Sequence, residues 1–147
     1  CHYEHTVPRL FIETFIDPLP EDIKVVVVDN VPTVVWSDQD RFEAHTRTVY
    51  AVERGTANLT RLNDCFWHCP TGQLSRKNEI DRCVEKGLMK YVLRFATEIS
   101  RRIDLRMVRV DFYIIDGAVT GGEVTLASGA FNEKISLSCA ESATQVA

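Results

Sequence analysis

The sequence has no apolar run near the roughly 20 residues that a membrane-spanning helix needs, and no signal-peptide pattern opens it. We therefore expect no membrane span and a cytoplasmic location. An excess of basic residues is also missing, because 17 lysines and arginines stand against 21 aspartates and glutamates. A chain with a formal net charge of −4 lacks the positive surface that binds phosphate backbones. Nucleic acid is therefore not an expected partner.

The cysteine count is odd and gives no complete disulfide framework. Five cysteines cannot all pair within one chain, and without a secretion signal we expect free thiols. Cys65, His68 and Cys69 have the residue types of a zinc site, but structural zinc requires four ligands. The missing ligand would have to come from the cysteine and histidines near the first residue. Free thiols fit this pattern better than zinc.

The composition is that of an ordinary globular domain, with 45% hydrophobic and 26% charged residues in a chain of 147. We expect a single domain over 1–131 and a weakly structured tail over 132–147. The valine-rich run 22–29 is typical of a central buried strand, and 31–37 returns as its partner. Further strands are predicted over the segments 8–14 and 48–53.

One long helix is predicted over 78–103. Asn78 is placed to cap its start, and Arg101 and Arg102 suit its C-terminal end. Gly87 lowers helical propensity by about 1 kcal/mol, but the apolar pattern continues through it. The following apolar residues recur at steps of three and four and form one stripe: Ile80, Val84, Leu88, Tyr91, Val92, Phe95, Ile99 and Ile103.

A β-hairpin is predicted over 106–125, where two alternating segments flank Asp116 and Gly117. Side chains alternate between faces along a strand, so Arg109 and Asp111 point away from the apolar residues. We expect the helix to seal the apolar face and to leave the charged face open to solvent or ligand. The predicted fold class is α+β, a mostly antiparallel sheet with one long helix packed on one face. The apolar residues of the first strand are Val108, Val110, Phe112 and Ile114.

The length of the hairpin loop decides which charged residues meet. With a two-residue turn, Asp111 lies opposite Gly122 and Glu123 points to the other face. A three-residue loop over 115–117, with a bulge, places Arg109 opposite Glu123 and Asp111 one diagonal step away. A metal site that includes both acids requires the three-residue loop. The alternative is a surface face with a cross-strand ion pair and no ligand.

The charged residues of this hairpin resemble a known family. Arg109-x-Asp111 followed by Glu123-x-Thr125 is similar to the metal-binding end of ATP-grasp ligases. The similarity is to the TupA-like branch, which acts in teichuronopeptide and surface-polysaccharide biosynthesis. The shared features are the run RVDFY over 109–113, the later Asp-Gly pair and the sequence Gly-Glu-x-Thr. The likeness extends upstream to about Tyr3 and so covers most of the chain.

The resemblance implies ATP and magnesium as cofactors. Asp111 and Glu123 would be metal ligands, with Thr125 as a third where many relatives have asparagine. Arg109 would be catalytic and would stabilise negative charge on an acyl phosphate or its tetrahedral adduct. Magnesium usually takes one or two carboxylates together with phosphate oxygens, which suits this set.

The resemblance also implies a nucleotide site upstream. Backbone groups of Glu13, Thr14 and Phe15 would contact adenine, Asp22 would meet the ribose hydroxyls, and Lys24 would sit near the phosphates. The plain alternative for the first three is an edge strand entering a loop. For Asp22 and Lys24 it is the solvated start of a strand.

Two functions from different classes follow. The first is an ATP- and magnesium-dependent carboxylate–amine ligase whose substrate is a small-molecule or glycan-precursor carboxylate. By the resemblance, Arg41 would face a substrate carboxylate or phosphate, and its plain alternative is ordinary surface charge. The family's lid subdomain has no counterpart in the sequence, so we expect the C-terminal half of such an enzyme. The second is a non-catalytic domain of the same fold that binds a nucleotide or a protein partner, or forms a homodimer.

Overall fold

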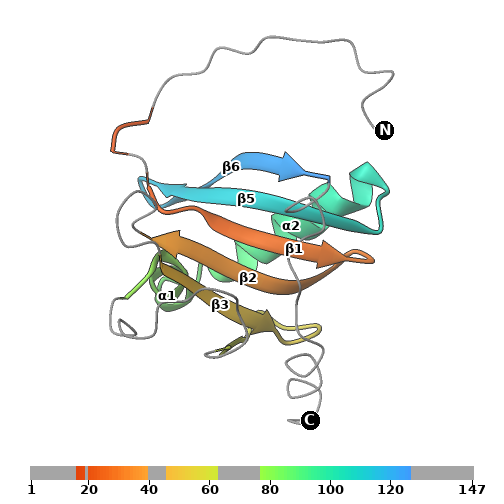
Figure 1. Cartoon of the computed structure of the whole chain (residues 1–147), viewed down its shortest axis with the longest axis horizontal. Coiled ribbons are helices and arrows are strands. Elements are labelled where there is room, and N and C mark those ends of the chain that lie inside the picture. The colour runs from red at the N-terminus through yellow and green to blue at the C-terminus, as the bar shows by residue number, and fades with distance from the viewer. Residues whose placement is uncertain (1–15, 19, 40–45, 63–76, 127–147) are drawn as a thin grey trace.

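The computed structural model describes the following residues: 16–18, 20–39, 46–62 and 77–126. Within them the chain forms one antiparallel sheet with strand order β4-β3-β2-β1-β5-β6 and two helices (Figure 1). The predicted α+β class with an antiparallel sheet is confirmed. The elements are β1 (Ile23–Val28), β2 (Val31–Gln39), β3 (Thr46–Val52), β4 (Leu59–Arg61), α1 (Glu79–Glu85), α2 (Met89–Ile103), β5 (Met107–Ile115) and β6 (Ala118–Thr125).

The valine-rich segment forms the central strand that its sequence predicts. β1 lies between β2 and β5 and is almost entirely buried. Asp29 and Asn30, with φ of 48° and 65°, make the two-residue turn into β2, and both residue types tolerate this left-handed conformation. β3 confirms the strand predicted near 48–53, and β4 is a short strand that was not predicted. The predicted strand 8–14 lies outside the described residues.

The single long helix predicted over 78–103 is wrong, because the segment forms two helices. Gly87 adopts a φ of 66° directly after α1, a conformation that glycine adopts at no steric cost and that ends an α-helix. Asn78 caps α1 as predicted, with its side chain accepting a hydrogen bond from the backbone of Asp81. Arg101 and Arg102 lie in the last turn of α2 as predicted.

The break also changes which residues the helices bury. Val84 and Tyr91, which the predicted stripe places inside, are 49% and 39% exposed. An interruption of a few residues restarts the helix with a different rotation about its axis, so one stripe cannot run through both helices. The buried residues are instead Ile80, Cys83, Met89, Val92, Leu93, Ala96 and Ser100.

The hairpin loop has two residues, the shorter of the two loop lengths considered from the sequence. Asp116 and Gly117 have φ of 51° and 78°, and Ile115 pairs with Ala118. The register then shifts farther along the hairpin, at a β-bulge between Asp111 and Phe112. Because the bulge adds one residue to β6, it places Asp111 opposite Glu123 after all. Neither pairing expected from the loop length alone occurs: Glu123 does not lie opposite Arg109, which pairs with Thr125, and Asp111 does not lie opposite Gly122.

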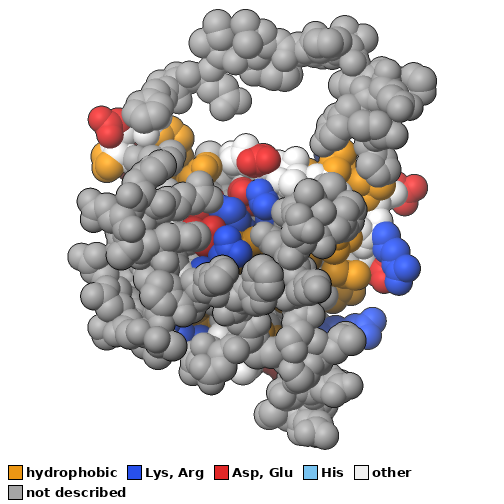
Figure 2. Space-filling model, viewed as in Figure 1, with side chains coloured by type: hydrophobic (Ala, Val, Ile, Leu, Met, Phe, Trp, Pro, Cys, Tyr) orange, Lys and Arg blue, Asp and Glu red, His pale blue; other side chains and the backbone are white. Residues whose placement is uncertain are grey.

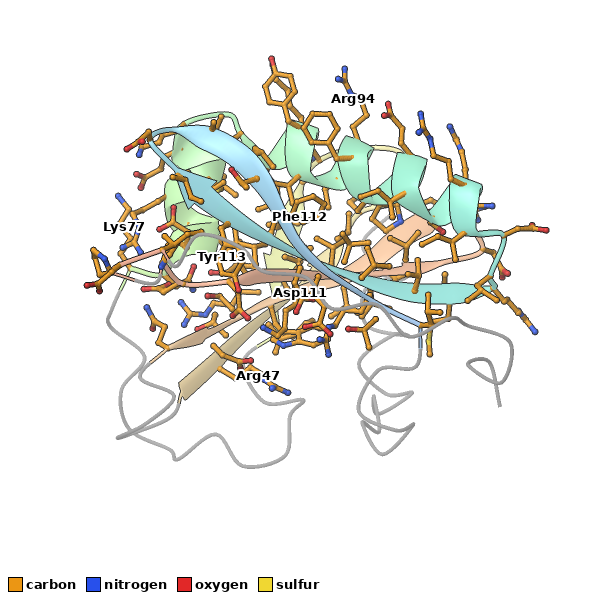
Figure 3. All side chains as sticks on the ribbon, turned by 90° about the horizontal axis from the view of Figure 1, so that it is seen from above. Arg47, Lys77, Arg94, Asp111, Phe112 and Tyr113 are labelled. Carbon is orange, nitrogen blue, oxygen red and sulfur yellow. The ribbon has the colours of Figure 1, made fainter. Side chains whose placement is uncertain are left out.

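The two helices cover one face of the sheet, as predicted for the apolar face of the hairpin. α2 passes behind β1 and β5 in Figure 1, and Figure 3 shows Phe112 on the helix side and Arg47 on the other. Val108, Val110 and Phe112 are each 1% exposed within this core. Neither helix in the described part of the chain has the length and apolar composition to cross a membrane.

Candidate functional site

The sheet face opposite the helices carries a row of side chains that crosses five strands. Residues directly opposite each other in antiparallel strands point to the same face, so successive pairs define a line across the sheet. This central row runs through Glu123, Asp111, Lys24, Trp36 and Val49. The acidic pair, a lysine and a tryptophan are therefore brought together by strand register alone.

Further charged side chains surround the row and form an acid–base cluster. Figure 2 shows lysine, arginine, aspartate and glutamate side chains gathered near the centre of this face. The cluster comprises three carboxylates and three cations: Asp22, Asp38, Asp111, Lys24, Arg47 and Arg109. Sequence reasoning identified four of them and missed Asp38 and Arg47 as members.

Lys24 connects the carboxylates of three neighbouring strand segments. Its Nζ donates to Asp22 and lies 3.6 Å from Oδ2 of Asp111 and 3.9 Å from Oδ2 of Asp38. The predicted phosphate-facing lysine and ribose-facing aspartate are therefore in direct contact with each other. Lys24 is also the direct neighbour of Asp111 across the sheet.

Two arginines complete the cluster with paired hydrogen bonds. Arg109 donates from Nε and Nη2 to the two carboxylate oxygens of Asp111, over 2.7 and 3.1 Å. Arg47 makes the same kind of contact with Asp38, over 2.6 and 3.2 Å. Such two-pronged pairs fix the plane of the carboxylate as well as its position. Asp111 is thus held rigidly at the centre of the face.

The centre of the charged face is buried, so the prediction that it stays open is wrong there. Asp22, Lys24, Asp38 and Asp111 are only 4–6% exposed. A small apolar cluster lies beside them on the same face: Val26, Val34, Trp36 and Val49. Buried charge is costly unless opposite charges and hydrogen bonds compensate it, and the equal numbers of cations and carboxylates do so here.

Glu123 and Thr125 lie at the sheet edge and differ from the centre. Glu123 is exposed, and the hydroxyl of Thr125 donates to its Oε1 over 3.0 Å. Among the described residues of this face, Glu123 adds a fourth carboxylate to the three cations of the cluster.

In the described ranges no group of three or more histidine, cysteine or acidic residues is arranged to hold a metal ion, so Asp111 and Glu123 are the metal-ligand candidates that the register brings together. Magnesium commonly takes one or two carboxylates and completes its shell with water and phosphate. Each Asp111 oxygen accepts one N–H from Arg109, and a carboxylate offers about four lone-pair sites in total. Asp111 and Glu123 therefore retain acceptor capacity for one shared ion.

The bulge that aligns the acidic pair depends on Gly122. A Cβ on Gly122 would lie 2.5 Å from Cε2 of Tyr113, well inside contact distance, whereas Gly121 has open space. Any side chain at this position would have to displace the ring of Tyr113. Two consecutive glycines inside an alternating strand are a recognised signal of a bulge, and that signal was available in the sequence.

Several predicted site residues lie outside the described residues. They are Glu13, Thr14, Phe15 and Arg41, together with the cluster of Cys65, His68 and Cys69. Their predicted roles are neither supported nor opposed by the structure. Cys83 is a free thiol, as expected, and burial raises its pKa to about 11, which makes it a poor nucleophile.

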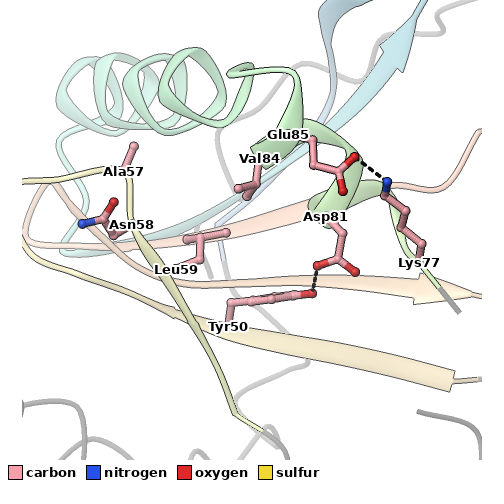
Figure 4. Close-up of a pocket in the computed structure, with 8 residues that line it drawn as sticks. All are labelled: Tyr50, Ala57, Asn58, Leu59, Lys77, Asp81, Val84 and Glu85. Carbon is pink, nitrogen blue, oxygen red and sulfur yellow. Dashed lines mark hydrogen bonds and ion pairs between the residues drawn. The ribbon is translucent and has the colours of Figure 1, made fainter. Parts of the chain in front are cut away.

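A groove lies on the helix side, between α1 and the strands β3 and β4. This open groove of about 630 Å³ contains Tyr50, whose hydroxyl donates to Asp81 over 2.5 Å (Figure 4). Asn78 donates to the same hydroxyl, and Lys77 pairs with Glu85 at the rim. Burial, followed by the hydrogen bond to Asp81, raises the pKa of Tyr50 to about 12. These contacts hold α1 on the sheet and give the groove a structural role.

Comparison with known proteins adds no relative to this description. No family model matches the chain, and no similar curated protein or solved structure was found. The resemblance to the TupA-like ATP-grasp ligases therefore stays a prediction made from the sequence.

Proposed function

We propose that the charged sheet face binds ATP with magnesium, and that the domain belongs to a carboxylate–amine ligase of the ATP-grasp type. The observation that carries this proposal is the alignment of Asp111 and Glu123 on adjacent strands, next to Arg109 and Lys24. Two hard-oxygen ligands and two cations in one place are the groups that a magnesium-bound phosphate chain requires.

The residues have distinct roles in this reaction. Asp111 and Glu123 would hold the magnesium ion, with the hydroxyl of Thr125 as a further ligand. Magnesium supplies the charge neutralisation that phosphoryl transfer from ATP to a carboxylate needs. Arg109 stabilises negative charge when an amine then displaces phosphate from the acyl phosphate. The rigid pairing of Arg109 with Asp111 keeps both groups in position before substrate binds.

The remaining nucleotide contacts belong to the same proposal. Lys24 lies beside Asp111 and would face the phosphates, and Asp22 next to it would meet the ribose hydroxyls. Backbone groups over 13–15 would contact adenine. The substrate would be a small-molecule or glycan-precursor carboxylate. The ligand would bind on the sheet face opposite the helices, next to the exposed Glu123 at its edge.

Isothermal titration calorimetry with ATP and magnesium tests the proposal. The variants Asp111→Asn and Glu123→Gln remove one charge each with little change in shape. We expect each to weaken binding at least tenfold, because a charged ligand contact is worth about 1.5–3 kcal/mol. Glu98→Gln is the matched control, since Glu98 is a half-exposed carboxylate on α2. Equal heats in all four proteins would overturn the proposal.

A second candidate function is a non-catalytic domain that forms a homodimer. β6 is an edge strand, and its Val124 is 41% exposed, which favours pairing with another strand. The bulge at Gly122 and the charge of Glu123 act against such pairing. Size-exclusion chromatography with light scattering tests for the dimer. A chain that stays monomeric at high concentration excludes it, and a dimer that Val124→Lys disrupts supports it.

A further inference from the structure

Trp36 has a buried hydrogen-bond donor that no described residue satisfies. The side chain is 2% exposed and lies in the middle of the central row, on β2. Its indole Nε1 has no acceptor in the part of the chain that the structure describes. The great majority of buried polar groups in folded proteins do have partners, so this N–H requires an explanation.

The apolar packing of Trp36 does not explain the donor. The ring packs with Val26, Val34 and Val49, and a phenylalanine would also bury apolar surface there. A buried N–H group loses its hydrogen bond to water, and this loss lowers stability when no protein acceptor replaces the water. A phenylalanine has no such group and would avoid this cost. The tryptophan is therefore explained better by an acceptor that arrives with a ligand.

Two cations lie near the ring of Trp36. Lys24 is the direct neighbour of Trp36 across the sheet, and the guanidinium carbon of Arg47 lies 5.4 Å from the ring centroid. The ring therefore lies beside two cations, each of which also contacts carboxylates of the cluster. An acceptor that carries negative charge forms a stronger hydrogen bond with the indole N–H than a neutral one does.

We propose that Trp36 donates a hydrogen bond from Nε1 to an oxyanion oxygen, of either a carboxylate or a phosphate, in the ligand bound on the charged face. This inference rests on the proposed function for the identity of the whole ligand. Neighbouring strands lie about 4.8 Å apart, so Trp36 is roughly 10 Å across the sheet from Asp111. The oxygen therefore belongs to a part of the ligand beyond the atoms that coordinate the metal. Trp36 orients that part and fixes which ligands are accepted.

The indole proton of Trp36 reports on this bond directly by NMR. The chain has two tryptophans, and Trp67→Phe assigns the Trp36 signal. Three probes are titrated separately: magnesium with ATP, inorganic phosphate, and succinate. Sodium chloride of equal ionic strength is the control. A downfield shift of the Trp36 indole proton that saturates is expected with at least one probe. A shift with succinate alone identifies a carboxylate, and one with ATP or phosphate identifies a phosphate oxygen.

The variant Trp36→Phe keeps an aromatic ring and removes the donor. We expect it to bind the active probe at least tenfold more weakly, with a circular dichroism spectrum like that of the wild type. The indole signal of the unmodified chain remains a valid test if this variant folds poorly. A Trp36 signal that none of the three probes moves overturns the inference.

The failure of this inference can be told apart from failure of the proposed function. If ATP binds and Glu123→Gln weakens it, but the Trp36 signal and the affinity of Trp36→Phe are unchanged, the inference is wrong and the proposed function stands. If ATP does not bind but phosphate or succinate shifts the Trp36 signal, the inference stands and the proposed function is wrong.

Discussion

The two faces of the sheet are stabilised by different interactions, although the same strands form both. On β1, Ile23, Val25 and Val27 point to the helices and are completely buried. Lys24, between them in sequence, points to the other face and contacts carboxylates there. The helix side is stabilised by apolar burial, which needs no precise partner. The charged side is stable only with its charges paired, and such expensive burial is typical of functional sites.

The largest effect is expected on the helix side. Phe112 is the largest fully buried side chain, so Phe112→Ala should lower the free energy of unfolding by about 3–5 kcal/mol. Val124→Ala, at an exposed position on the adjacent strand, should cost far less. Urea unfolding monitored by circular dichroism measures both. Equal losses would mean that the helix side is not the main core.

The next largest loss of stability is expected when a buried cation is removed from the charged side. Lys24→Met keeps most of the side-chain volume and removes the cation that three carboxylates contact. We expect a loss of about 3 kcal/mol, because removing one partner leaves buried charge uncompensated. Lys90→Met, at an exposed position on α2, is the control and should be nearly neutral. Urea unfolding measures both variants. A similarly small loss of unfolding free energy in both would contradict the view that Lys24 compensates the buried carboxylates.

A smaller loss of stability is expected when a methyl group is added at the bulge. Gly122→Ala places a methyl group against the ring of Tyr113 and should cost about 1–3 kcal/mol, as overpacking does. It should also weaken binding of ATP with magnesium, because the bulge aligns Asp111 with Glu123. Gly121→Ala has open space and should bind as the wild type does. Calorimetry of both variants decides whether the bulge positions the acids.

The smallest effect concerns the contact between the helix layer and the sheet. Tyr50→Phe removes the hydroxyl that Asp81 accepts from and should cost about 1 kcal/mol at neutral pH. The pKa of Tyr50 is raised from 10.0 to about 12. The unfolded chain therefore ionises first, and the wild type should lose stability as the pH rises from 10 towards 12. Unfolding measured across that window should show a shallower decline for the variant.

The sequence predicts most of the sheet because alternation and turn chemistry are local. The valine run of β1 and the left-handed turn at Asp29 and Asn30 follow from neighbouring residues alone. The helix prediction failed at Gly87, where a positive φ ends the helix. The apolar periodicity of the sequence continues past this residue and therefore did not reveal the break. Propensity is a weak guide where a single backbone angle decides.

The site was harder to predict because its geometry depends on register between strands distant in the chain. Asp111 meets Glu123 only because a two-residue turn and a bulge at Gly122 combine. From the turn alone, a site with both acids requires a three-residue loop, because the bulge is not considered. Asp38 and Arg47 were missed because they meet only when β2 extends to Gln39 and pairs with β3.

The position of the metal in the bound protein is the most direct test of the account. Manganese replaces magnesium in many oxygen-ligand sites, and it broadens NMR signals of nearby amides. With substoichiometric manganese and ATP, we predict the strongest broadening at Asp111, Glu123 and Lys24. Little broadening is expected at Glu98 on the outer side of α2. Broadening centred elsewhere, or none at the hairpin, would contradict a nucleotide site on the charged face.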